Sequence, residues 1–188
     1  TAYVNSIERW QDALEALELY NSSSPYVTNA VLKSLRKAER PREVLSVLGK
    51  YSTAATSYTI ACGAVDGDVA RSFLEQCRYP DDRLYAAVIS RQEDRGRAVE
   101  IYEKMPNRCR SERVSSSVIS VACAADAERI YAESSKSDYC KTAVISSCGR
   151  EGLWRRALSY VDADCSVSVA RAAVSACESG ACDAAAIA

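Results

Sequence analysis

Cysteine is the residue type in this chain with the clearest capacity for chemistry. The sequence holds nine cysteines and no histidine. No two cysteines form a C-x-x-C pair, and histidine ligands are missing, so the spacing favours neither structural zinc nor thioredoxin-type redox chemistry. The odd number also argues against a fully paired disulfide framework. We therefore predict free thiols buried among small apolar residues at Cys62, Cys123, Cys148 and Cys177.

Cys109 is the one candidate for a reactive thiol, because Arg108 and Arg110 flank it and a guanidinium favours the thiolate. Without histidine the chain cannot build Ser-His-Asp or Cys-His nucleophilic sites. It also lacks a phosphate-binding loop, and its close carboxylate pairs fit loops and helix caps. We expect no catalytic residue, no metal site, no cofactor and no small-molecule substrate, and hence a non-enzymatic protein.

Composition indicates a helical protein that folds on its own. The 188 residues are 48% hydrophobic and 26% charged, with only 7 Gly and 4 Pro, too few for a turn-rich β-sandwich. The formal net charge of −1 gives no global attraction to nucleic acid or anionic lipid. The longest uncharged stretch, 51–65, is shorter than the roughly 20 apolar residues that cross a bilayer, so we expect no membrane insertion.

The chain also compares well with itself. An apolar position, here called the landmark, recurs in steps of 28, 29, 30, 26 and 29 residues at Leu32, Ile60, Ile89, Ile119, Ile145 and Val174. Each copy reads as two helices joined by a turn, most clearly in 141–158, where the turn falls at Gly152 and the second helix begins around Trp154. The first copy is only a second helix, in which Trp10 matches Trp154. Neither helix can bury its apolar stripe alone, so stacked neighbours must supply the core.

We therefore predict an all-α fold, an α-solenoid of about six stacked helix-turn-helix repeats in which each first helix packs on the next one. One array spans 1–188, with a partial first repeat over 1–22 and repeats beginning near 26, 55, 83, 113, 139 and 168. A non-repetitive helical bundle is the alternative.

The segment Ala143–Leu158 resembles a pentatricopeptide repeat, and Ala98–Pro106 resembles the end of one. The resemblance covers roughly 26–188, although members of that family repeat at about 35 residues and tetratricopeptide repeats at about 34. The tetratricopeptide signature W-x-x-L-G-x-x-Y is absent from the first helices, which favours the pentatricopeptide reading. The resemblance implies a partner of single-stranded RNA, read one base per repeat by two or three side chains on the inner helices.

Carried over residue by residue, the family's base-reading position on the first helix falls on Asn29, Ser57, Ala86, Ser116, Thr142 and Arg171. The second position, at the end of each repeat, falls near Ser52, Asp81, Ser111, Ser137 and Ser166. Only Ser57 with Asp81, and Asn29 with Ser52, resemble base-reading pairs. The candidates are therefore Asn29, Ser52, Ser57, Asp81, Ser116 and Thr142, with helix capping and solvated polar faces as the alternative role.

Two local basic clusters offer phosphate contacts despite the neutral net charge. One lies in a single hairpin and one in a linker; their members are Lys33, Arg36, Lys37, Arg40 and Arg42, and Arg108, Arg110 and Arg113. Together with the resemblance they indicate a subunit of an organellar ribonucleoprotein, such as a mitochondrial ribosome, that contacts RNA, neighbouring proteins or both. The alternative is a sequence-selective single-stranded RNA-binding factor for RNA processing or translation. We expect a mitochondrial location, with the plastid as the alternative; no targeting peptide is visible.

Overall fold

A computed structural model describes residues 9–20, 24–51 and 54–187, without the side chains of residues 20 and 180–187. All regular structure in these residues is helical, which confirms the all-α prediction, and no strand occurs among them. None of the described helices is both long and apolar enough to cross a membrane. The chain divides into two compact units, 1–93 and 94–188, which are described separately.

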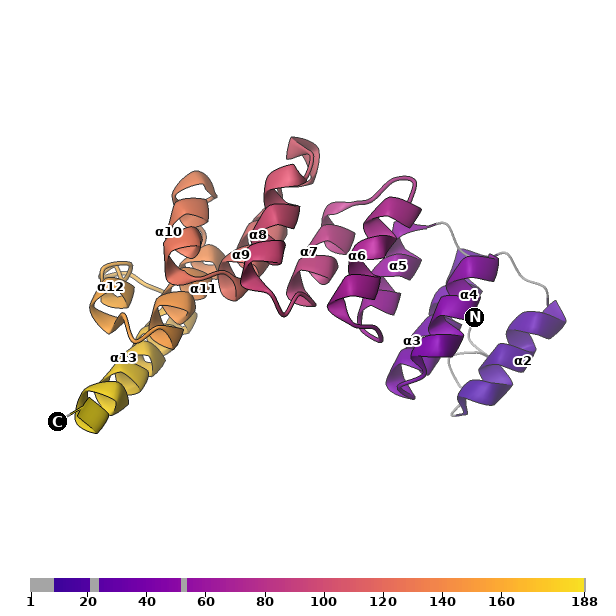
Figure 1. The fold of residues 1–188 in the computed structure, drawn as a ribbon, viewed down its shortest axis with the longest axis horizontal. Coiled ribbons are helices and arrows are strands. Elements are labelled where there is room, and N and C mark those ends of the chain that lie inside the picture. Colours follow the sequence, from indigo (N-terminus) through magenta and orange to yellow (C-terminus); the bar gives the residue numbers. More distant parts are fainter. Residues whose placement is uncertain (1–8, 21–23, 52–53, 188) are drawn as a thin grey trace. The chain divides into compact units, whose positions relative to one another are not determined.

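The first unit consists of short helices that pack in chain order (Figure 1). α3 contacts the preceding α2 and the following α4, and also lies against α5, while α5 in turn contacts α7. First helices thus touch one another directly, with second helices beside them. The elements are α2 (Trp10–Tyr20), α3 (Pro25–Lys37), α4 (Pro41–Tyr51), α5 (Ala55–Cys62), α6 (Gly67–Gln76) and α7 (Asp82–Ser90).

The second unit follows the same scheme, because α11 contacts both α9 and α13. The second helices α10 and α12 each pack on the first helix before and after them. Two exposed ion pairs link successive second helices: Arg129 to Glu103 at 2.8 Å, and Arg156 to Glu128 at 2.5 Å. The elements are α8 (Arg95–Lys104), the 3-10 helix η1 (Asn107–Cys109), α9 (Glu112–Val121), α10 (Ala124–Glu133), α11 (Asp138–Arg150), α12 (Trp154–Leu158) and α13 (Val167–Ile187).

Four of the six landmark residues lie at the centre of the core. Leu32, Ile89, Ile119 and Ile145 are all 0% exposed, whereas Ile60 is half-buried. Val174, the landmark of the last copy, is instead 58% exposed. The sequence predicts repeats beginning near 26, 55, 83, 113, 139 and 168, and the first helices begin at Pro25, Ala55, Asp82, Glu112, Asp138 and Val167.

Two equivalent hairpin turns use a left-handed residue to end the first helix. Gly152, seven residues after Ile145, has φ 70°, as the predicted turn requires. Glu39, seven residues after Leu32, takes the same conformation with φ 54° although it carries a side chain. In both turns the next residue donates its N–H to a carbonyl five residues back, at 3.1 Å for Arg40 to Leu35 and 2.9 Å for Leu153 to Cys148.

The cysteine predictions are confirmed in part. Cys62 and Cys148 are buried free thiols, and burial raises their pKa to about 12 and about 11. Cys123 and Cys177 are only partly buried, so the prediction of burial is wrong for them. Cys177 lies on α13, which packs on α11 and α12 and is followed by no other described helix. The prediction of a reactive thiol at Cys109 is also wrong. Cys109 lies in η1 and is only 5% exposed, so dissolved reagents cannot easily reach its thiol.

Candidate nucleic-acid interface

Asn29 and Ser57, the candidate base-reading residues of two successive first helices, bond to each other. The Ser57 hydroxyl donates to Asn29 Oδ1 over 2.7 Å, and thereby joins α3 to α5. Ser57 is 0% exposed, whereas Asn29 is half-buried. The serine is therefore occupied in holding two helices together, and of the pair only Asn29 reaches the surface.

The corresponding residues of the other copies differ in exposure. Ala86 is buried and Arg171 is exposed. Ser116 is half-buried and donates its hydroxyl to the Arg113 carbonyl at 3.0 Å, within its own helix. Thr142 Oγ1 is the one side-chain oxygen or nitrogen in the described residues that is buried with no hydrogen-bond partner. These four positions do not present a uniform set of polar groups.

The second candidate position coincides with helix N-caps. Asp81 accepts from the Leu84 N–H at 2.9 Å and caps α7, and Ser137 accepts from the Cys140 N–H at 3.4 Å at the start of α11. A capping side chain satisfies an N–H group that would otherwise lack a partner, so its oxygen is already in use. Ser52 lies outside the described residues.

The basic hairpin of α3 and α4 keeps most of its charges free. Lys33, Lys37 and Arg42 are exposed without an ion pair among the described residues. Arg40 instead bonds Glu43 at 2.6 Å and lies 4.5 Å over the Trp10 ring, and this bond lowers the pKa of the Glu43 carboxyl. The remaining member, Arg36, lies over Gly63 at the end of α5. Free cationic groups for phosphate therefore remain chiefly on Lys33, Lys37 and Arg42.

The linker cluster of the second unit is partly committed to structure. Arg110 donates to the Glu103 carbonyl at 3.1 Å and stacks 5.1 Å from the Tyr102 ring centre. Arg108 and Arg113 are exposed. Arg113 is the second residue of α9, and it lies about one helical turn before Ser116 on the same face.

Arg113, already a candidate for phosphate contact, belongs to a set of exposed first-turn residues that lie six positions before the landmark. The sequence reasoning missed the other members of this set. The second residue of four first helices is a large side chain: Tyr26 in α3, Arg83 in α7, Arg113 in α9 and Tyr139 in α11. Tyr26 is 75% and Tyr139 76% exposed. Tyr26, Arg113 and Tyr139 each lie three residues before a candidate base-reading residue, so the two share a helix face, whereas Arg83 precedes the buried Ala86. Counting back from the landmark in the sequence could have revealed these first-turn residues.

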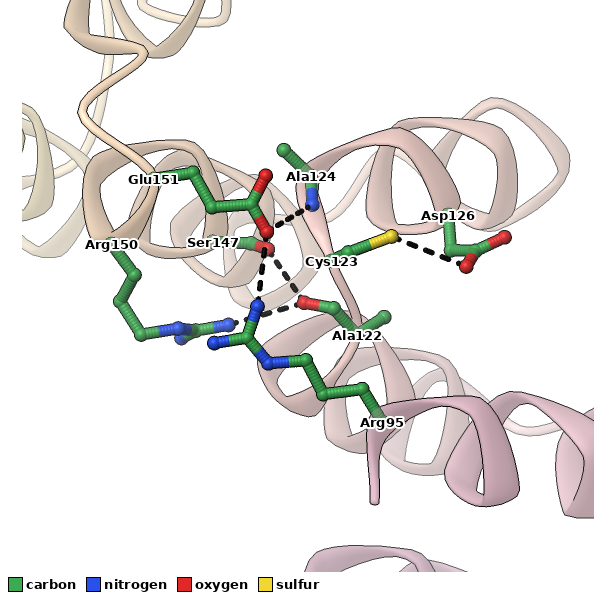
Figure 2. A network of polar contacts seen from close by, with 8 residues as sticks. All are labelled: Arg95, Ala122, Cys123, Ala124, Asp126, Ser147, Arg150 and Glu151. Carbon is green, nitrogen blue, oxygen red and sulfur yellow. Dashed lines mark hydrogen bonds and ion pairs between the residues drawn. The ribbon is translucent and has the colours of Figure 1, made fainter. Parts of the chain in front are cut away.

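Polar bonds between turns and neighbouring helices hold the first helices in register. Figure 2 shows the Ala122 carbonyl, in the turn after α9, accepting from Ser147 Oγ at 2.9 Å and from Arg150 at 3.3 Å, both on α11. In the first unit Arg91, just after α7, donates twice to the Val65 carbonyl in the turn after α5, at 2.9 and 3.1 Å. These bonds fix the spacing of the first-turn residues within each unit.

Glu151 completes this network in the second unit. Its Oε1 accepts from the Ala124 N–H at 3.1 Å and from Arg95 at 3.0 Å (Figure 2). Arg150 lies near Arg95, and burial together with that second guanidinium lowers its pKa. One carboxylate thus serves a helix N-terminus and offsets two neighbouring guanidinium groups.

No group of three or more potential metal-ligating side chains occurs among the described residues. In comparisons with known proteins, no family model matches the chain, and no curated protein matches it either. The pentatricopeptide resemblance is therefore carried by the sequence pattern alone.

Proposed function

We propose that this chain is a non-enzymatic, pentatricopeptide-like helical-repeat subunit of an organellar, mitochondrial ribonucleoprotein that contacts RNA, neighbouring proteins or both. Within each unit we take the helices to be stacked repeats of a solenoid. The support is the order of contacts, α3 to α5 to α7 and α9 to α11 to α13, in which each first helix meets the next. The organellar location rests on the family resemblance.

The observation that carries RNA contact is the exposure of the first-turn residues. Tyrosine rings at 75% and 76% exposure are costly to leave in water and offer stacking faces to unpaired bases. Arg83 and Arg113 can stack on bases or meet phosphates from the equivalent positions. Such contacts tolerate any base, because every base has a π-face.

The same geometry ranks the two candidate functions. A sequence-selective factor needs free polar groups at the base-reading positions. Ser57 is fully buried in its bond to Asn29, and Asp81 caps α7. These constraints favour an assembly subunit with little base preference over a sequence-selective factor.

RNA binding by the purified chain tests this function. Fluorescence anisotropy with labelled unstructured RNAs of several sequences should give similar affinities, falling with salt by a slope of roughly 0.7 per phosphate neutralised. Removing the stacking rings by Tyr26→Ala with Tyr139→Ala should cost about 1–3 kcal/mol per stacked base. Tyr79→Ala is the matched control, because Tyr79 is 69% exposed but lies outside the first helices.

Replacing Lys33 and Lys37 with Ala tests the phosphate contacts separately. Both lysines are exposed on α3, so the double variant should weaken binding to all RNAs and flatten the salt dependence. Affinity weaker than the roughly 10⁻⁴ to 10⁻⁶ M of non-specific binding at physiological salt would reject RNA contact and leave protein partners.

A further inference from the structure

The outward face of α13 carries an exposed stripe of side chains. Val167, Arg171, Val174 and Glu178 follow one another at helical spacing, and all four are exposed, the two valines to 77% and 58%. The opposite face of the helix, with Val169, Ala173 and Ala176, is buried. The stripe therefore points directly away from α11, on which α13 packs.

The exposure of Val174 is unusual for its position in the repeat. Of the equivalent residues, Leu32, Ile89, Ile119 and Ile145 are fully buried and Ile60 is half-buried. In the preceding copy the chain turns at Gly152 and α12 folds back on α11. α13 instead continues as one helix from Val167 to Ile187, through the positions equivalent to that turn. No second helix covers its landmark among the described residues.

The charges of the stripe are complementary to those of the same stripe on a second copy of the chain. Arg171 lies three residues before Val174 and Glu178 four residues after it, and neither forms an ion pair with another described side chain. When two such helices align antiparallel about Val174, the arginine of each faces the glutamate of the other. A two-fold axis then produces two identical ion pairs around a central valine contact.

We propose that this stripe is a dimerisation surface that pairs with the α13 stripe of a second copy of the chain. The valines supply apolar contact, and the two Arg171–Glu178 pairs fix the antiparallel direction. With one positive and one negative charge per helix, the stripe has no net attraction for a polyanion, so RNA is a poor occupant.

Sedimentation equilibrium over a wide concentration range, with a thiol reductant present, tests the proposal. The average mass should rise with concentration from 20.4 kDa toward twice that value. Arg171→Glu and Glu178→Arg should each raise the dissociation constant about tenfold or more, because each places like charges opposite one another twice. The double variant exchanges both charges and should restore dimerisation.

Val174→Glu should abolish dimerisation, and Glu133→Arg, a charge reversal at an exposed site on α10, should leave it unchanged. A chain that is monomeric at every concentration overturns the proposal, as does a stripe covered by the helix of a different protein. Failure of the double charge exchange to restore a dimer that the single variants weaken would also overturn it.

Discussion

Removing the Glu151 carboxylate should selectively destabilise the second unit. The carboxylate accepts the Ala124 N–H at 3.1 Å and the Arg95 guanidinium at 3.0 Å. A hydrogen bond to a charged group contributes about 1.5–3 kcal/mol, and an exposed ion pair about 0.2–1 kcal/mol. Arg95 is 49% exposed, so the ion pair belongs at the low end of its range. Glu151→Ala should therefore cost about 2 kcal/mol, roughly a thirty-fold increase in the unfolding equilibrium constant.

Glu151→Gln separates the charge from the hydrogen bond. The amide oxygen can still accept from Ala124, but it no longer offsets the neighbouring guanidinium groups of Arg95 and Arg150, so about half of the loss should remain. Glu151→Ala and Arg95→Ala both remove the same ion pair between these two side chains. The double variant should therefore lose less stability than the sum of the two single variants.

Urea unfolding followed by tryptophan fluorescence measures this effect in the right unit. The chain has two tryptophans, and Trp154 lies three residues after Glu151, so a Trp10→Phe background reports the second unit alone. Glu133→Ala, an exposed glutamate of α10, is the control and should change stability by less than about 0.5 kcal/mol. An equal, near-zero effect of Glu151→Ala and Glu133→Ala would refute the assigned role of Glu151.

Two further predictions concern the turns and the thiols. Glu39→Gly should stabilise the chain by up to about 1 kcal/mol, because glycine adopts φ 54° without the penalty of a side chain. Gly152→Ala should destabilise the chain for the opposite reason. Thermal unfolding of both variants measures these effects, and a Glu39→Gly variant less stable than the wild type would contradict the prediction. Burial raises the pKa of Cys62 to about 12 and that of Cys148 to about 11 in the folded chain. Each folded thiol therefore keeps its proton at a pH where the unfolded thiol has lost it, so the stability that each thiol contributes is fully present below pH 9 and falls as the pH rises toward 12 and 11. By pH 10 the loss is about 1 kcal/mol for each thiol. Cys148→Ala should flatten that pH dependence in urea titrations, and rapid thiol labelling of folded Cys148 would show that it is not buried.

Much of the helical layout could be predicted because it depends on local signals. The apolar period places the starts of the first helices, and Gly152 marks a turn since only glycine adopts its left-handed conformation freely. Glu39 occupies the same turn position without any residue preference to reveal it. The Arg40 N–H closes the end of α3 on the Leu35 carbonyl, a local bond that goes with this conformation and that the type of residue 39 does not reveal.

The candidate site was harder to predict, because exposure depends on how helices rotate against one another. Spacing places Asn29 and Ser57 at equivalent positions, but it does not reveal that the serine turns inward to bond the asparagine. Cys177 shares its repeat position with the buried Cys148, yet it is partly exposed since no further described helix packs on α13. Burial of a helix face depends on neighbouring helices, which a sequence pattern does not show.

Ultraviolet cross-linking of unstructured RNA to the purified chain, followed by peptide mapping, tests the central claim most directly. The proposed RNA contact predicts cross-links in the first-turn peptides that contain Tyr26 and Tyr139, lost in the corresponding alanine variants and retained in Tyr79→Ala. Cross-links confined to the second helices, or none at RNA concentrations above the non-specific range, would contradict it.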